Sequence, residues 1–163
     1  MDYIFSSPPF FKDKNSLFGK TPMQHLARCV TFFEILCEKL DVKLAMIHTA
    51  KDHFTKISRG KVSGVNFQVD LVPNKSGIWE TLSDSSIHAI LSRYFCPYNK
   101  TMLDPFCGSG HFLKVAKSLG MDVIGIDNDK DQIEVAESGS NLSVIKKPGD
   151  RGHESEGLHW WDV

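Results

Sequence analysis

The spacing of hydrophobic residues changes several times along the chain, and each change marks a new secondary-structure element. Apolar residues recur every three or four positions from Pro22 to Leu40, which predicts a helix with one buried face, capped by Thr21. The short apolar run Asp2–Ser6 predicts a buried strand that ends at two prolines. The same reasoning predicts further strands at Val42–His48, Val65–Val72, Thr101–Phe106, Val123–Ile126 and Leu142–Ile145, and further helices from Ser83 or Asp84 to Phe95, at Phe112–Leu119 and at Lys130–Glu137.

Strands and helices alternate in this order, which predicts an α/β fold with a doubly wound, mostly parallel, Rossmann-like sheet flanked by helices. We expect residues 1–150 to form one domain with two halves, 1–75 and 76–150, followed by a flexible tail at 151–163. The basic, glycine-punctuated segment Lys51–Gly64 is assigned neither a strand nor a helix.

The segment Asp104–Gly110, with the sequence DPFCGSG, lies where a predicted strand passes into a helix. Its two glycines allow positive φ angles, so the backbone can approach a ligand closely, and the helix N-terminus presents free N–H groups. Asp127 ends the next predicted strand, where a carboxylate can accept the hydroxyls of a ribose. A GxG turn alone also occurs as a plain structural turn. The chain has neither GxGxxG nor GxxxxGK[ST], which favours a nucleoside cofactor without phosphates.

The tetrapeptide Ser7-Pro8-Pro9-Phe10 directly follows the first predicted strand. Two prolines make it stiff and leave carbonyl oxygens free as acceptors. The amino group of a flat base could donate its hydrogens to Ser7 and to the Pro8 carbonyl while its ring stacks on Phe10. Taken alone, such a motif is more often a turn that ends a strand.

These motifs together resemble those of the DNA amino-methyltransferases: DPFCGSG resembles motif I, the following GID resembles motif II, and SPPF resembles motif IV. The resemblance implies S-adenosylmethionine as cofactor and methylation of the exocyclic amino group of a flipped DNA base. SPP-aromatic sequences in this family mostly accompany cytosine-N4 methylation, with adenine-N6 as the alternative. The implied catalytic residues are Ser7, Pro8, Pro9 and Phe10, and the implied cofactor-binding residues are Asp104, Pro105, Phe106, Gly108, Ser109, Gly110, Asp127, Asn128 and Asp150.

The order of the motifs resembles the β class of that family, because the catalytic motif precedes the cofactor motif. Leu142–Ile145 resembles the motif III strand, so we expect the two ends of the chain to adjoin in space. Three features depart from the family pattern. His111 replaces the usual Thr, the helix in the place of motif X lacks its Lys-Pro signature, and no long target-recognition segment separates the halves. Sequence specificity is therefore expected to be slight, or to come from another chain, either a homodimer partner or a separate specificity subunit.

Charge is distributed unevenly, although the net charge is −1. Residues 12–61 hold ten Lys and Arg against five Asp and Glu, whereas residues 120–163 hold four against ten. A solvated surface could be unevenly charged by chance. The same charge pattern also fits a protein that binds a polyanion with one of its faces. The candidate DNA-binding residues are Lys12, Lys14, Lys51, Lys56, Arg59 and Lys61.

Other chemistry is not favoured by the sequence. The four cysteines and seven histidines show no metal-ligand spacing, and Ser109 lacks a GxSxG frame, so no metal is expected. Cys96 precedes a proline rather than following one, which argues against covalent methylation of ring carbon. No apolar run in the sequence is long enough to span a membrane. We expect a cytoplasmic protein of the restriction–modification type. RNA or protein-amide methylation, and a catalytically silent nucleic-acid-binding subunit, remain alternatives.

Overall fold

The computed structural model describes residues 1–12, 16–50, 53–61, 64–73, 82–138 and 144–146. The candidate site residues Lys14, Lys51 and Asp150 lie outside these ranges, as does the predicted tail. Within the described part, no helix is both long enough and apolar enough to cross a membrane.

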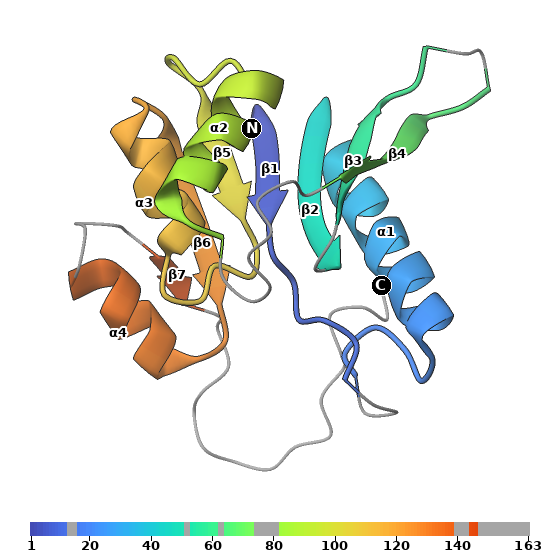
Figure 1. The fold of residues 1–163 in the computed structure, drawn as a ribbon, viewed down its shortest axis with the longest axis horizontal. Helices are drawn as coiled ribbons and strands as arrows, with labels where there is room; N and C mark the ends of the chain where they lie inside the picture. The colour runs from blue at the N-terminus through green and yellow to red at the C-terminus, as the bar shows by residue number, and fades with distance from the viewer. Residues whose placement is uncertain (13–15, 51–52, 62–63, 74–81, 139–143, 147–163) are drawn as a thin grey trace.

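The described residues form a seven-stranded sheet in the order β4-β3-β2-β1-β5-β6-β7 (Figure 1). Five neighbouring strands are parallel: β2 (Leu44–Ala50), β1 (Tyr3–Ser6), β5 (Thr101–Asp104), β6 (Asp122–Asp127) and β7 (Val144–Lys146). At the other edge, β3 (His53–Arg59) and β4 (Phe67–Pro73) continue the sheet as antiparallel strands. The predicted, mostly parallel sheet is therefore confirmed, with an antiparallel extension.

Helices cover both faces of the sheet. Successive strand residues point to opposite sides, so buried apolar side chains lie on both faces. Helix α1 (Pro22–Lys39) begins at the predicted Thr21 cap, and its Phe33 packs in one buried cluster with Ile4 of β1. Helices α2 (Asp84–Tyr94), α3 (His111–Ser118) and α4 (Lys130–Ser138) contribute to a second buried cluster, which contains Phe5, the next residue of β1. Crossovers on both faces make the fold doubly wound and Rossmann-like, as the sequence predicted.

The sequence analysis missed a strand within Lys51–Gly64, because seven of these residues form β3. Its apolar side chains face both sides of the sheet: Phe54 lies in the cluster with Phe5, whereas Ile57 lies in the cluster with Phe33. Charged and polar residues stand between them, so the segment shows neither strict alternation nor a continuous apolar run. Pairing with β2 and β4 on both sides, rather than local sequence, makes this segment a strand.

Strands β1 and β7 are not neighbours, since β5 and β6 lie between them. The first strand and the last described strand therefore do not adjoin, contrary to the expectation for the two chain ends. The predicted motif III strand lies at the edge of the sheet instead. The residues that follow Lys146, Asp150 among them, are outside the described part of the chain.

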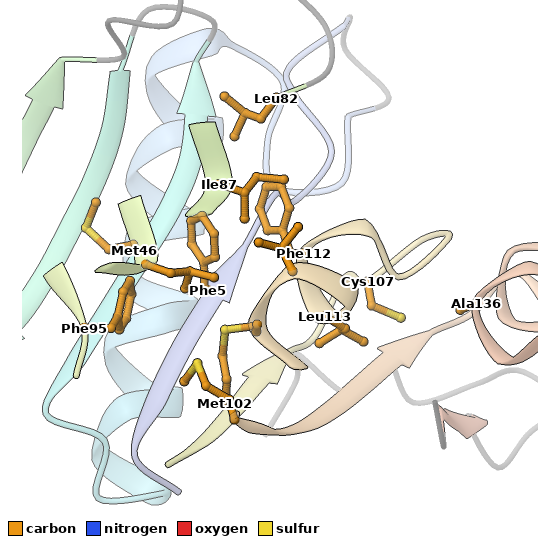
Figure 2. Close-up of a cluster of buried hydrophobic side chains, with 14 of the residues drawn as sticks. Phe5, Met46, Leu82, Ile87, Phe95, Met102, Cys107, Phe112, Leu113 and Ala136 are labelled. Atoms are coloured by element: carbon orange, nitrogen blue, oxygen red, sulfur yellow. The ribbon is translucent and has the colours of Figure 1, made fainter. Parts of the chain in front are cut away.

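The larger buried cluster fixes β1, the strand that leads into SPPF (Figure 2). The Phe5 ring is fully buried and stacks on Phe112 of α3 with 4.4 Å between ring centroids. It also contacts Phe54 at 5.9 Å and Phe95 at 5.8 Å. A single side chain therefore joins β1 to β3, to the end of α2 and to the helix after the GxG turn.

Replacing Phe5 should consequently destabilise the whole domain. We expect Phe5→Ala to lower the free energy of unfolding by about 3–5 kcal/mol, because a buried aromatic ring is lost and a cavity is left. Urea unfolding followed by circular dichroism measures the change. Tyr98→Ala is the matched control, since that ring is 79% exposed, and it should change stability by less than about 0.5 kcal/mol. Equal effects of the two substitutions would contradict this account of the core.

Candidate active site

The two sequence motifs meet at one edge of the sheet. Strands β1 and β5 pair in parallel, with Ile4 opposite Leu103, so both carboxyl ends reach the same side. The chain leaves β1 through α1 on one face and leaves β5 through α3 on the other. This reversal is the topological switch point, where open α/β sheets bind their ligands.

A buried hydrogen bond joins the motifs directly. Ser6 Oγ donates to Asp104 Oδ1 at 2.6 Å, and the Phe106 backbone N–H donates to the same oxygen at 3.1 Å. The Asp104 side chain is only 2% exposed, and this burial raises its pKa to about 7, although the two hydrogen bonds oppose the shift. A carboxyl group in this setting is poised to ionise beside a positively charged ligand.

The GxG turn has the backbone conformation that its glycines predicted. Gly108 and Gly110 have φ angles of 51° and 76°, and Gly110 caps α3. The Gly108 N–H donates to Asp127 Oδ2 at 2.7 Å, while the Asp129 N–H donates to Oδ1 at 2.9 Å. Asp127 therefore fastens the turn to the end of β6, a role that the sequence did not reveal. Each of its oxygens keeps a second lone pair with which it can accept a further hydrogen bond.

A third glycine allows the turn to lie this close to β6. A Cβ atom on Gly125 would stand 2.5 Å from Leu113 Cδ1 and 2.9 Å from Cys107 Sγ. The Cys107 N–H also donates to the carbonyl of Ile126 at 3.0 Å. A glycine at position 125 is thus required for the close approach of α3 and the turn to this strand.

Residues of both motifs line one cavity of about 290 Å³ at this edge. The predicted residues Ser7, Asp104, Phe106, Gly108 and Ser109 are among its lining. The cavity is also lined by residues that the sequence did not single out for this site: His48, Leu82, Cys107, His111, Phe112 and Gln132. Of the other predicted residues, Pro8 is buried beside it, Pro9 and Asn128 are exposed, and Pro105, Phe10 and Asp127 are partly exposed.

Two buried histidines hold the SPPF segment. His48 Nδ1 lies 3.5 Å from Ser7 Oγ, and the Phe10 ring meets the His48 ring edge-on at 5.2 Å. His25 of α1 makes a hydrogen bond to the backbone of Pro9, and burial lowers the pKa of its ring, which keeps it neutral. The sequence carried one signal for His48, since the predicted strand Val42–His48 ends at the same edge as Ser7.

Cys107 lies inside the turn but is not set up as a nucleophile. Burial raises the pKa of its thiol to about 12, so the reactive thiolate is scarce. Among the described residues, no three His, Cys, Asp or Glu side chains gather as metal ligands. His111, which stands where the family has Thr, contacts the Asp84 carboxylate across the gap between α3 and α2.

Of the four predicted DNA-binding cations that the structure describes, two are paired with carboxylates. Lys56 pairs with Asp70 at 3.0 Å, and Arg59 pairs with Asp41 at 2.6 Å, both on or next to the antiparallel edge. Lys12 and Lys61 are exposed. Pairing with a carboxylate weakens the field that Lys56 and Arg59 can offer to phosphate.

Among the comparisons with known proteins, a family model matches part of the chain. The model of the DNA methylase family N6_N4_Mtase matches residues 81–138, which contain the GxG turn and Asp127. This segment is thus similar to the family that the sequence motifs resemble. None of the curated proteins matches the chain.

Two solved structures have limited similarity to the chain, at 19% sequence identity each. The "M1.HpyAVI-SAM complex" aligns with a TM-score of 0.47 over 86% of this chain and 89% of that chain. M1.HpyAVI alone aligns with a TM-score of 0.45 over 87% and 88%, respectively.

The raised pKa of Asp104 predicts a specific pH dependence of stability. Because its folded-state pKa is about 7 instead of 3.8, the protonated carboxyl favours the folded state. This contribution is complete below about pH 4 and is lost as the pH rises toward 7, by at most about 1.4 kcal/mol per pH unit. Asp104→Asn should therefore become progressively more stable than the wild type between pH 5 and pH 7 in urea unfolding without ligand. Asp122→Asn, at an exposed position, should follow the wild type; a pH-independent difference for Asp104→Asn would contradict the assignment.

Proposed function

From the DNA methylase match over residues 81–138, we propose that the chain transfers a methyl group from S-adenosylmethionine to the exocyclic amino group of a flipped DNA base, with cytosine N4 as the preferred target. One observation carries the proposal: Ser7 of SPPF lines the same cavity as Asp104 and Gly108 of DPFCGSG. A base held by the first motif would thus lie beside a cofactor held by the second.

The residues of the cavity fit this cofactor. Asp104 offers a buried carboxylate that a cationic group would keep ionised, because a nearby positive charge offsets the cost of burial. Gly108 leaves its Cβ position open, with the nearest atom, Gln132 Oε1, at 3.8 Å, so the backbone can meet a ligand there. Asp127 can accept a ribose hydroxyl with its remaining lone pairs. The cofactor, when bound, supplies an electrophilic methyl group on a sulfonium.

The SPPF segment supplies the acceptors for the target. Ser7 Oγ and the Pro8 carbonyl are proposed to accept the two hydrogens of the amino group, and Phe10 to contact the base ring. Neither proline donates a hydrogen bond, so the segment presents acceptors on a stiff backbone. Holding both hydrogens turns the nitrogen lone pair toward the methyl carbon, and most of the rate gain then comes from alignment.

The choice of cytosine rests on the motif SPPF, which in this family mostly accompanies cytosine rather than adenine. Adenine N6 is the second candidate. A protein-amide substrate is less favoured, because NPPY would be expected in place of SPPF. A silent binding subunit is disfavoured by Ser7, Asp104 and the GxG turn, which all face the cavity or shape it.

DNA is proposed to approach the carboxyl-terminal edge of the sheet, where the cavity lies. Of the candidate cations, Lys12 is exposed and lies two residues after SPPF, which would place it near a bound strand. Lys56 and Arg59 could serve only by exchanging Asp70 and Asp41 for phosphate.

Asp127 should be required for cofactor binding. We expect Asp127→Ala to weaken the binding of S-adenosylmethionine by about 1.5–3 kcal/mol, through a lost charge-assisted hydrogen bond and the loss of the partner of Gly108 N–H. Isothermal titration calorimetry measures the affinity. Asp122→Ala, on the same strand but exposed, should bind like the wild type. Unchanged affinity in Asp127→Ala would remove the cofactor assignment.

Ser7 should be required for methyl transfer but not for cofactor binding. Ser7→Ala should slow transfer to unmethylated DNA by roughly tenfold to a thousandfold, because it removes an aligning acceptor, while calorimetric affinity for the cofactor stays the same. Cys107→Ala should keep its activity, since no covalent intermediate is involved. Nucleoside mass spectrometry with labelled cofactor should identify N4-methylcytosine. N6-methyladenine would correct the target base, and 5-methylcytosine would overturn the mechanism.

A further inference from the structure

We propose that His48 is the proton acceptor of this methyl transfer, reached through the hydroxyl group of Ser7. The inference rests on the proposed function and adds a residue that neither motif contains. Its basis is the placement of a buried imidazole beside the one hydroxyl that is offered to the target amino group.

Methylation of an amino group leaves a proton that must be removed. As the nitrogen lone pair forms the new bond to the methyl carbon, the carbon–sulfur bond breaks and its electron pair stays on sulfur. The positive charge thereby passes to the nitrogen, which still carries both of its hydrogens. One of these protons has to leave before the neutral methylamino product is formed. An acceptor in contact with that hydrogen, or one hydroxyl away, is therefore useful.

Ser7 is the first residue of the proposed proton path from the amino group to His48. In the proposed pose its Oγ accepts a hydrogen of the amino group, so its own hydrogen has to point elsewhere. The His48 Nδ1 atom lies 3.5 Å from Oγ and can accept that hydrogen when the ring is neutral and protonated on Nε2. This distance is long for a hydrogen bond, but catalytic contacts commonly shorten when the substrate binds.

The surroundings of His48 hold its ring in place. The side chain is 4% exposed, stacks on Phe54 of β3 at 4.8 Å and meets the Phe10 ring edge-on at 5.2 Å. Phe54 and Phe10 thus pack against the ring, and the ring itself belongs to strand β2. His48 lines the cavity that Ser7 lines, which gives the imidazole access to the reacting group.

The other titratable groups around the cavity are less suited to the task. Asp104 also lines it, but its Oδ1 already accepts hydrogen bonds from Ser6 and Phe106. His111, from α3, is engaged with Asp84. The elements packed on His48 from β3 and from SPPF contribute Phe54 and Phe10, which carry no charge.

The complete step then balances. The amino nitrogen passes one proton to Ser7 Oγ while the Ser7 hydroxyl proton moves to His48 Nδ1. The products are a neutral methylamino base, a neutral thioether, a regenerated Ser7 hydroxyl and a protonated His48, which returns its proton to solvent after release.

His48→Asn tests the inference, because an asparagine amide oxygen can accept a hydrogen bond near the Nδ1 position but cannot take up a proton there. Single-turnover methyl transfer should be slower by about 10- to 1000-fold in this variant. The wild-type rate should fall as the pH is lowered through the range in which histidines titrate, about pH 8 to 5. This pH-dependent decrease should be absent in His48→Asn. A decrease of the rate that persists in His48→Asn would reflect the titration of another group, such as Asp104, and would overturn the proposal. His88→Asn, at an exposed position on α2, is the matched control and should behave like the wild type.

A second measurement requires no activity. In the protein without cofactor, the ¹⁵N resonance of His48 Nδ1 should report an accepted hydrogen bond that disappears in Ser7→Ala. An identical resonance in both proteins would overturn the contact and with it the proposal.

Two further comparisons separate the possible failures. Ser7→Ala and His48→Asn should be non-additive, because they interrupt one path; additive rate losses would argue against it. If the wild type transfers methyl groups normally and His48→Asn matches it at every pH, the proton path is wrong and the proposed function stands. If the wild type transfers no methyl group to any DNA, the proposed function fails.

Discussion

The hydrogen bond from Ser6 Oγ to Asp104 Oδ1, 2.6 Å long and fully buried, is the contact on which the site depends. It joins residues that are 98 positions apart at the ends of two adjacent parallel strands. Ser7, which follows Ser6, and Phe106, which donates to the same carboxylate, are thereby fixed relative to each other. The sheet itself therefore sets the distance between SPPF, the proposed target-binding segment, and DPFCGSG, the proposed cofactor-binding segment.

Burial gives this edge of the sheet an unusual electrostatic character. Asp104 carries a carboxyl group whose pKa is about 7, so its charge depends on what lies next to it. A sulfonium or ammonium group in the cavity would favour the ionised form, whereas an empty cavity favours the neutral form. The site is thus matched to a cation, and its own stability is greatest when the carboxyl group is neutral. His25 shows the opposite case, a base that burial keeps neutral beside the Pro9 carbonyl.

Asp127 illustrates how a residue proposed to bind the cofactor can also be structural. Its two oxygens accept the N–H groups of Gly108 and Asp129, which fixes the GxG turn against β6. A loss of cofactor affinity in Asp127→Ala therefore combines two effects. His48 is the converse case: it packs against Phe54 and Phe10 as a structural residue would, and its Nδ1 atom also lies 3.5 Å from Ser7 Oγ, the contact on which the proposed proton transfer rests.

The sequence by itself determined the parallel core, the helix cap at Thr21 and the turn at Gly108 and Gly110, because each depends on local periodicity or on backbone freedom. It left the cap of α2 open between Ser83 and Asp84, and the structure has Ser83 there. It also predicted that Ser7 and Asp104 belong to one site. Only the tertiary structure made His53–Arg59 a strand, since that segment is defined by partners on both sides. Only the tertiary structure brought His48 to Ser7 and paired Lys56 and Arg59 with acids. Such contacts depend on how strands align across the sheet, and no spacing along the chain encodes them.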